Sequence, residues 1–132
     1  MLLYRPIGLK ELELIAKSGF KKIPTRLPEQ PIFYPVLNFE YAEKIARDWN
    51  TKANIFAGFV TKFKLEKAYI KKYEIRQVGN QIHQELWVAA EELEEFNSHI
   101  IGKITIEAAY YGEKFSGAID PVTNLPKSID LK

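Results

Sequence analysis

The segment His83-Gln-Glu-Leu-Trp87 carries the residue types best suited to chemistry in this 132-residue chain. In an extended strand, successive side chains point to opposite faces, so the imidazole, the carboxylate of Glu85 and the indole would share one face. Neighbours on that face lie about 6.6 to 7 Å apart along the strand, which lets all three line one ligand. The alternative is a solvent-facing strand that carries an amphipathic tryptophan.

Other side chains could complete such a site. Arg5 ends a short apolar run, where its planar guanidinium could hold a phosphate or ribose by paired hydrogen bonds, or could form a surface ion pair instead. Tyr34 and Tyr41 could stack on an aromatic ligand or pack in the core. Arg26 and Gln30 lie in a proline-braced loop, which suits the rim of a binding site and equally a passive crossover.

The hydrophobic pattern predicts the elements that must position these residues. We expect one α+β domain over residues 1–113, mainly an antiparallel twisted sheet with two principal helices and a short third, followed by a loosely ordered tail over 114–132. Strands are expected at 2–5 (stopped by Pro6), 32–36, 55–65, 82–88 and 100–110, and helices at 9–19, at 38–49 behind an Asn38 cap, and at 91–96. Residues 69–78 suit a strand or an irregular helical turn, and we expect extended structure.

Composition narrows the classes of function. Without cysteine the chain has no disulfide, thiolate zinc site or thiol nucleophile, which fits a cytoplasmic protein. His83 and His99 match no metal-ligand spacing, so no metal is expected. A net charge of +2 does not indicate nucleic acid as a partner, and no stretch is apolar enough to predict a membrane span.

Several segments together resemble a known family. They are Leu3-Tyr-Arg-Pro-Ile-Gly8, Arg26-Leu-Pro-Glu-Gln-Pro-Ile-Phe-Tyr-Pro35, Ile45-Ala-Arg-Asp-Trp-Asn50, Gly58-Phe-Val-Thr-Lys-Phe63, His83-Gln-Glu-Leu-Trp87 and Glu92-Leu-Glu-Glu-Phe-Asn97. This combination resembles small bacterial proteins labelled "ADP-ribosylation/crystallin J1", from about Leu3 to Gly112. The order of elements is also similar to the compact ADP-ribosyltransferase fold, a split β-sandwich in which an early Arg or His, a second-strand Ser or Tyr and a late Glu surround NAD.

By position, this resemblance implies that Arg5, Tyr34 and Glu85 converge on one site that takes NAD as a substrate. Glu85 would stabilise the oxocarbenium-like state formed as nicotinamide leaves, Arg5 would hold the pyrophosphate or adenosine ribose, and Tyr34 would stack on nicotinamide. Further contacts to the nucleotide are expected from Arg26, Gln30, His83 and Trp87. The acceptor of ADP-ribose is left open. The alternative is a non-catalytic module that binds a protein partner through the same cleft or its aromatic face.

Overall fold

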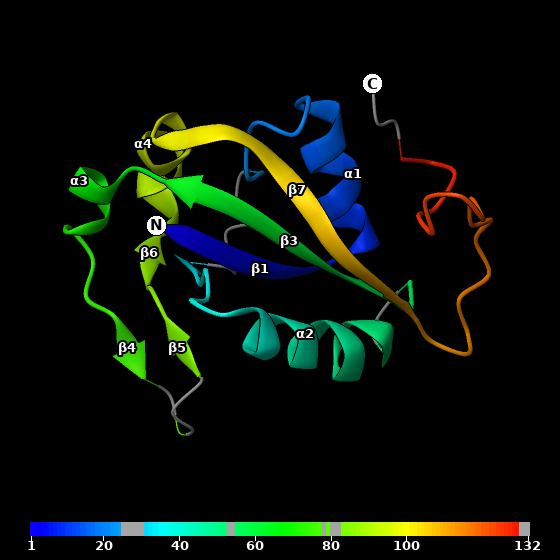
Figure 1. Ribbon diagram of the computed structural model, residues 1–132. Helices are drawn as coiled ribbons and strands as arrows, with labels where there is room; N and C mark the ends of the chain where they lie inside the picture. The colour runs from blue at the N-terminus through cyan, green and yellow to red at the C-terminus, as the bar shows by residue number, and fades with distance from the viewer. Residues whose placement is uncertain (25–30, 53–54, 78, 80–82, 130–132) are drawn as a thin grey trace.

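The structure is a computed structural model that describes residues 1–24, 31–52, 55–77, 79 and 83–129 (Figure 1). The described residues form an α+β fold of antiparallel strand pairs and four α-helices. The strands are β1 (Leu2–Gly8), β2 (Ile32–Phe33), β3 (Ala57–Leu65), β4 (Arg76–Gln77), β5 (Gln84–Glu85), β6 (Val88–Ala89) and β7 (Ile100–Tyr111). The helices are α1 (Leu9–Lys17), α2 (Phe39–Asp48), α3 (Lys67–Ile70) and α4 (Leu93–Ser98), with 3₁₀ turns at Asn50–Lys52 and Ala90–Glu92.

The central sheet has the strand order β1-β3-β7, with α1 on one face and α2 on the other (Figure 1). The expected end of the first strand at Pro6 is wrong, because β1 runs on to Gly8. Tyr4 exchanges both backbone hydrogen bonds with Val36, each 2.8 Å long, on the edge of β1 away from β3. Pro6 lies two residues further on and turns its nitrogen to that same edge. No strand of the described chain pairs there, so the missing N–H costs no hydrogen bond.

The strands expected at 32–36 and 82–88 form a single interrupted ladder over their described residues, and residue 82 lies outside these. Phe33 pairs with Val88 and Val36 pairs with Glu85 in one register. Between these pairs the carbonyl of Pro35 accepts the N–H of Leu86 at 2.9 Å, but proline has no N–H to return the second bond. The ladder is therefore split into β2–β6 and the Val36–Glu85 bridge.

This register sets Tyr34 directly opposite Trp87 across the interruption. Val36 also bridges to Tyr4, so the interrupted ladder adjoins the edge of β1. Beyond it β5 pairs with β4, and Arg76 lies opposite Glu85. Directly paired residues point to the same face of a sheet, so the side chains of Tyr4, Val36, Glu85 and Arg76 belong to one face.

Two hydrophobic clusters lie on the two faces of the central sheet. The larger one, on the α1 face, is built from alternate residues of β1 and β3, from α1 and from α4, including Leu3, Ile7, Leu12, Phe63 and Phe96. The smaller one, on the α2 face, joins Val36, Ala42, Ala46 and Val60. Helix α2 begins as expected, since the Asn38 side chain accepts the N–H of Tyr41 at 2.8 Å.

Two further expectations need correction. The expected extended run over 69–78 is wrong for its described part, residues 69–77, which contains the end of α3 and the short strand β4. The tail beyond residue 113 is not loose over its described part. Leu125 and Ile129 are each only 8% exposed and belong to the larger core cluster, and the Tyr111 hydroxyl donates to the carbonyl of Asn124 at 2.7 Å. Burial of these two apolar side chains stabilises the packing of a segment whose composition is otherwise mostly polar.

Within the described residues, no helix combines the length and the apolar character that crossing a membrane requires.

Candidate functional site

Glu85 is a nearly buried carboxylate at the centre of a group of polar and aromatic side chains. Its residue is 7% exposed, and it stands on β5 between Val36 and Arg76. Because it shares a face with Tyr4 and Val36, its side chain points to the side of the sheet that α2 covers. Helix α2 thereby covers one side of this carboxylate, through Tyr41.

Two neutral donors hold the Glu85 carboxylate, one on each oxygen. The Tyr41 hydroxyl of α2 donates to Oε1 at 3.0 Å, and the Trp87 indole N–H donates to Oε2 at 3.1 Å. Glu85 forms no ion pair with the residues that the structure describes. Carboxylate oxygens have about four lone-pair positions, so Glu85 retains capacity to accept further hydrogen bonds.

Tyr41 links Glu85 to His83. The two rings are stacked, with centroids 4.4 Å apart and planes 20° from parallel. Burial raises the pKa of Tyr41 to about 12, and the hydrogen bond to Glu85 and its negative charge act in the same direction. Tyr41 therefore stays a neutral donor at neutral pH.

The outer part of the site is aromatic and partly open to solvent. Tyr34 and Trp87 meet edge to face with centroids 5.9 Å apart, and they are 40% and 44% exposed. The Arg76 guanidinium lies 4.1 Å from the Trp87 ring, in cation–π geometry. We call the set Tyr34, Tyr41, Arg76, His83, Glu85 and Trp87 the Glu85 cluster.

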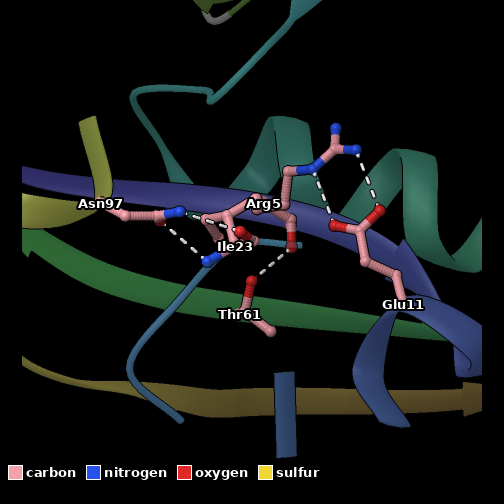
Figure 2. A network of polar contacts seen from close by, with 5 residues as sticks. All are labelled: Arg5, Glu11, Ile23, Thr61 and Asn97. Atoms are coloured by element: carbon pink, nitrogen blue, oxygen red, sulfur yellow. Dashed lines mark hydrogen bonds and ion pairs between the residues drawn. The ribbon is translucent and has the colours of Figure 1, made fainter. Parts of the chain in front are cut away.

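Arg5 does not join this cluster. Its guanidinium makes two 3.2 Å hydrogen bonds to the carboxylate of Glu11 on α1 (Figure 2). It also lies 4.9 Å from the Phe33 ring. Side chains alternate along β1, and it is Tyr4, the neighbour of Arg5, that shares a face with Glu85. The expected convergence of Arg5, Tyr34 and Glu85 is therefore wrong, because the sheet separates Arg5 from the other two.

The structure brings four of the expected residues together: Tyr34, His83, Glu85 and Trp87. Arg26 and Gln30 lie outside the described residues. Sequence reasoning missed Arg76 and considered Tyr41 only as a stacking ring. The pattern offered one signal for Tyr41, which is its place at the first turn of a well-capped helix. Nothing local marked Arg76, because its pairing with Glu85 is visible only in the fold.

Chemically, the Glu85 cluster offers an anionic oxygen pair, stackable rings and a guanidinium on one surface. Among the described residues no group of three or more His, Asp or Glu side chains is placed to hold a metal ion. Comparison of the chain with protein-family models, with curated proteins and with solved structures finds no match. The function is therefore inferred from the geometry of the Glu85 cluster.

Proposed function

We propose that the Glu85 cluster binds NAD or an ADP-ribose-like nucleotide and that the chain transfers ADP-ribose with release of nicotinamide, on a fold related to the ADP-ribosyltransferases. The observation that carries the proposal is the Glu85 carboxylate, 7% exposed and bonded by two neutral donors beside an exposed indole. A buried carboxylate without a counter-ion is costly to maintain, and such groups gather at functional sites. Cleavage of the nicotinamide–ribose bond develops positive charge that this carboxylate would stabilise.

Each side chain has a distinct part in this proposal. Glu85 faces the reacting ribose and accepts a hydrogen bond from its hydroxyl, while Tyr41 and Trp87 hold the carboxylate in place. Tyr34 offers a ring of which 40% is exposed for stacking on nicotinamide or adenine. Arg76 takes the anion-binding part first assigned to Arg5, because it lies on the same face as Glu85 and its guanidinium can contact pyrophosphate.

Nucleotide binding is tested by the fluorescence of Trp87. The chain has two tryptophans, and Trp49 is 70% exposed, so Trp49→Phe leaves Trp87 as the sole indole reporter at little cost to folding. We expect a saturable change in emission with NAD and with ADP-ribose at millimolar concentration. The change should weaken in Arg76→Gln and persist in Lys64→Gln, an exposed lysine outside the cluster. No change in emission and no heat of binding with either nucleotide would overturn the proposal.

Catalysis is tested by Glu85→Gln. The amide is nearly the same shape, and it can accept from the Trp87 N–H and donate to the Tyr41 oxygen, so the fold should persist. Loss of the negative charge removes stabilisation on the order of 3 to 4 kcal/mol from the transition state, so nicotinamide release should fall roughly 100- to 1000-fold with little change in nucleotide affinity. Glu40→Gln, an exposed change on α2, should leave the rate unaltered. Equal rates in wild type and Glu85→Gln would remove Glu85 from catalysis.

The second candidate is a non-catalytic module that binds a protein partner through the same surface. It is favoured by the exposed Tyr34, Trp87 and Arg76, because aromatic and arginine side chains dominate the energetics of protein interfaces. Nucleotide binding without nicotinamide release, or no nucleotide binding at all, would favour this candidate over the transferase.

A further inference from the structure

A second region of the molecule has the features of a binding site and lies away from the Glu85 cluster. It is a pair of adjoining cavities on the α1 face of the sheet. Their lining residues come mainly from the segment that follows α1 and from the corner where α4 leads into β7, and Figure 1 shows the place of both in the fold. Their volumes are about 520 and 670 Å³, within the range of small-molecule sites. Lys22, Glu94 and Asn97 line both cavities, so the two form one continuous depression.

The segment along the first cavity is held rigidly against the sheet. The Ser18 hydroxyl oxygen accepts the backbone N–H groups of Lys21 and Lys22 at 3.2 and 3.1 Å. Phe20 has a left-handed φ of 62°, and its carbonyl accepts the N–H of Ile104 on β7 at 2.7 Å. These bonds fix the position of the backbone from which two neighbouring lysines extend.

Asn97 of α4 fastens the other end of this segment. Its side chain accepts the N–H of Ile23 and donates to the carbonyl of the same residue, both at 2.9 Å (Figure 2). Ile23 is 2% exposed and belongs to the larger core cluster. The cavity wall is therefore a preformed part of the fold, which lowers the entropic cost of binding a ligand.

The first cavity is basic. Lys21, Lys22 and Lys103 line it, and none of them forms an ion pair within the described part of the chain. Two lysines outside this cavity do form ion pairs, Lys62 with Glu107 at 2.9 Å and Lys72 with Glu92 at 3.0 Å. Among the described residues that line this cavity Glu94 is the acidic one, so three lysines without an ion pair to the described chain stand beside one carboxylate.

The second cavity has a different character. Its wall combines apolar side chains, among them Leu14, Ile23 and Leu93, with the carboxylates of Glu91 and Glu94. The apolar surface can contact the carbon frame of a sugar, and the carboxylate oxygens can accept hydrogen bonds from its hydroxyl groups.

We propose that the two cavities together bind a phosphorylated sugar, with the phosphate among Lys21, Lys22 and Lys103 and the hydroxyl groups of the sugar toward Glu91 and Glu94. Ammonium groups are strong donors to phosphate oxygens, and three of them around one concave site favour a doubly charged phosphate monoester over a neutral sugar. The site lies on the face of the sheet opposite Glu85, so it is independent of the proposed nucleotide site.

Ribose 5-phosphate and ribose are the matched probes for this site. In the ¹⁵N-labelled full chain, we expect ribose 5-phosphate to shift the backbone amides of Lys22, Gly102 and Lys103 saturably at millimolar concentration, with ionic strength held constant. Ribose without the phosphate should leave these amides unshifted. Equal shifts with both probes, or none with ribose 5-phosphate, would overturn the proposal.

Charge variants identify the contacts. The double variant Lys22→Gln, Lys103→Gln should weaken ribose 5-phosphate binding by about tenfold or more, and Lys64→Gln on the other face of the sheet should not. All three lysines are exposed, so the variants should keep the dispersion of the wild-type spectrum. Unchanged affinity in the folded double variant would exclude the lysine site. Glu85→Gln should leave this binding intact, which keeps its outcome separate from that of the nucleotide site.

Discussion

Tyr41 is the residue on which the geometry of the Glu85 cluster depends most directly. Among the described residues, its hydroxyl makes the one hydrogen bond from α2 to the Glu85 carboxylate. Its ring stacks on that of His83. A nearly buried carboxylate that loses a donor cannot recover it from bulk water. Tyr41 is therefore a positioning residue for Glu85 in addition to being part of the small cluster on the α2 face.

Removal of this hydroxyl should destabilise the fold measurably. We expect Tyr41→Phe to lower the free energy of unfolding by about 1 to 2 kcal/mol, because Glu85 Oε1 loses its partner while the ring and its packing remain. Urea denaturation measures the change. Tyr34→Phe is the matched control, since that exposed hydroxyl forms no hydrogen bond with the described residues, and it should change stability by less than about 0.5 kcal/mol. Equal effects of the two substitutions would show that the hydrogen bond to Glu85 contributes nothing to the free energy of unfolding.

The raised pKa of Tyr41 should make the stability of the fold depend on alkaline pH. The folded pKa of Tyr41 is about 12 against an ordinary value of 10, so the folded state holds this proton more tightly than the unfolded state. Its contribution to stability is complete below pH 10 and is lost as pH rises from 10 to 12. Tyr110 has a pKa raised to about 12 as well, chiefly by burial, and adds to the same loss. The stability of Tyr41→Phe should therefore fall less steeply than that of wild type over this interval, as measured by urea titrations at each pH. Parallel curves would contradict the assignment.

At the scale of the elements, α2 reaches the sheet through small residues. Ala42 and Ala46 lie one turn apart on its buried face, and Gly58 of β3 lies against Ala46. A Cβ at position 58 would stand 2.1 Å from the carbonyl oxygen of Ala46 and 2.8 Å from the Cβ of Asn50. The absence of a side chain at Gly58 therefore lets the C-terminal end of α2 lie directly against β3.

Gly58→Ala should consequently cost about 3 kcal/mol or more, because the nearest atom is helix backbone that cannot rotate away. Gly8 provides the matched control. It is the direct cross-strand partner of Gly58, and a Cβ there would meet its nearest neighbour at 3.9 Å. Gly8→Ala should cost less than about 1 kcal/mol, mainly through its place as the cap of α1. Thermal unfolding of the two variants decides the point, and similar losses in both would mean that α2 adjusts freely.

At the scale of the whole molecule, the segment after β7 adds to the core on the α1 face that the sheet, α1 and α4 build. Leu125 and Ile129 enter the same cluster as Leu3 and Phe96, and a bridge between Ile119 and Pro126 closes the segment on itself. The two faces of the sheet therefore differ in what they hold. One holds most of the hydrophobic core and the basic cavity, and the other holds the Glu85 cluster.

Leu125→Ala should lower the free energy of unfolding by about 2 to 3 kcal/mol, since a side chain that is 8% exposed leaves a cavity in the core. Val122→Ala, at a position 90% exposed in the same segment, should change it by less than about 0.5 kcal/mol. Chemical denaturation of the full chain compares them. Equal and small losses would restore the expectation of a loosely ordered tail.

Local patterns in the sequence were sufficient for the long elements. The apolar stripe of α2 and its Asn38 cap, and the alternation in β3 and β7, follow from backbone periodicity, which neighbouring residues determine by themselves. Alternation likewise placed His83, Glu85 and Trp87 on one face, and the structure connects them through Tyr41.

The pairing of distant segments had to be seen in the tertiary structure. Arg5 and Glu85 lie on opposite faces because Val36 bridges Tyr4 to Glu85, and no local pattern reports a register between strands so far apart in the chain. The same holds for Arg76, which reaches Trp87 across a strand pair, and for Leu125, whose burial depends on a core that other segments build. Side-chain periodicity is a local property that neighbouring residues determine. Long-range packing determines which faces of the elements contact each other.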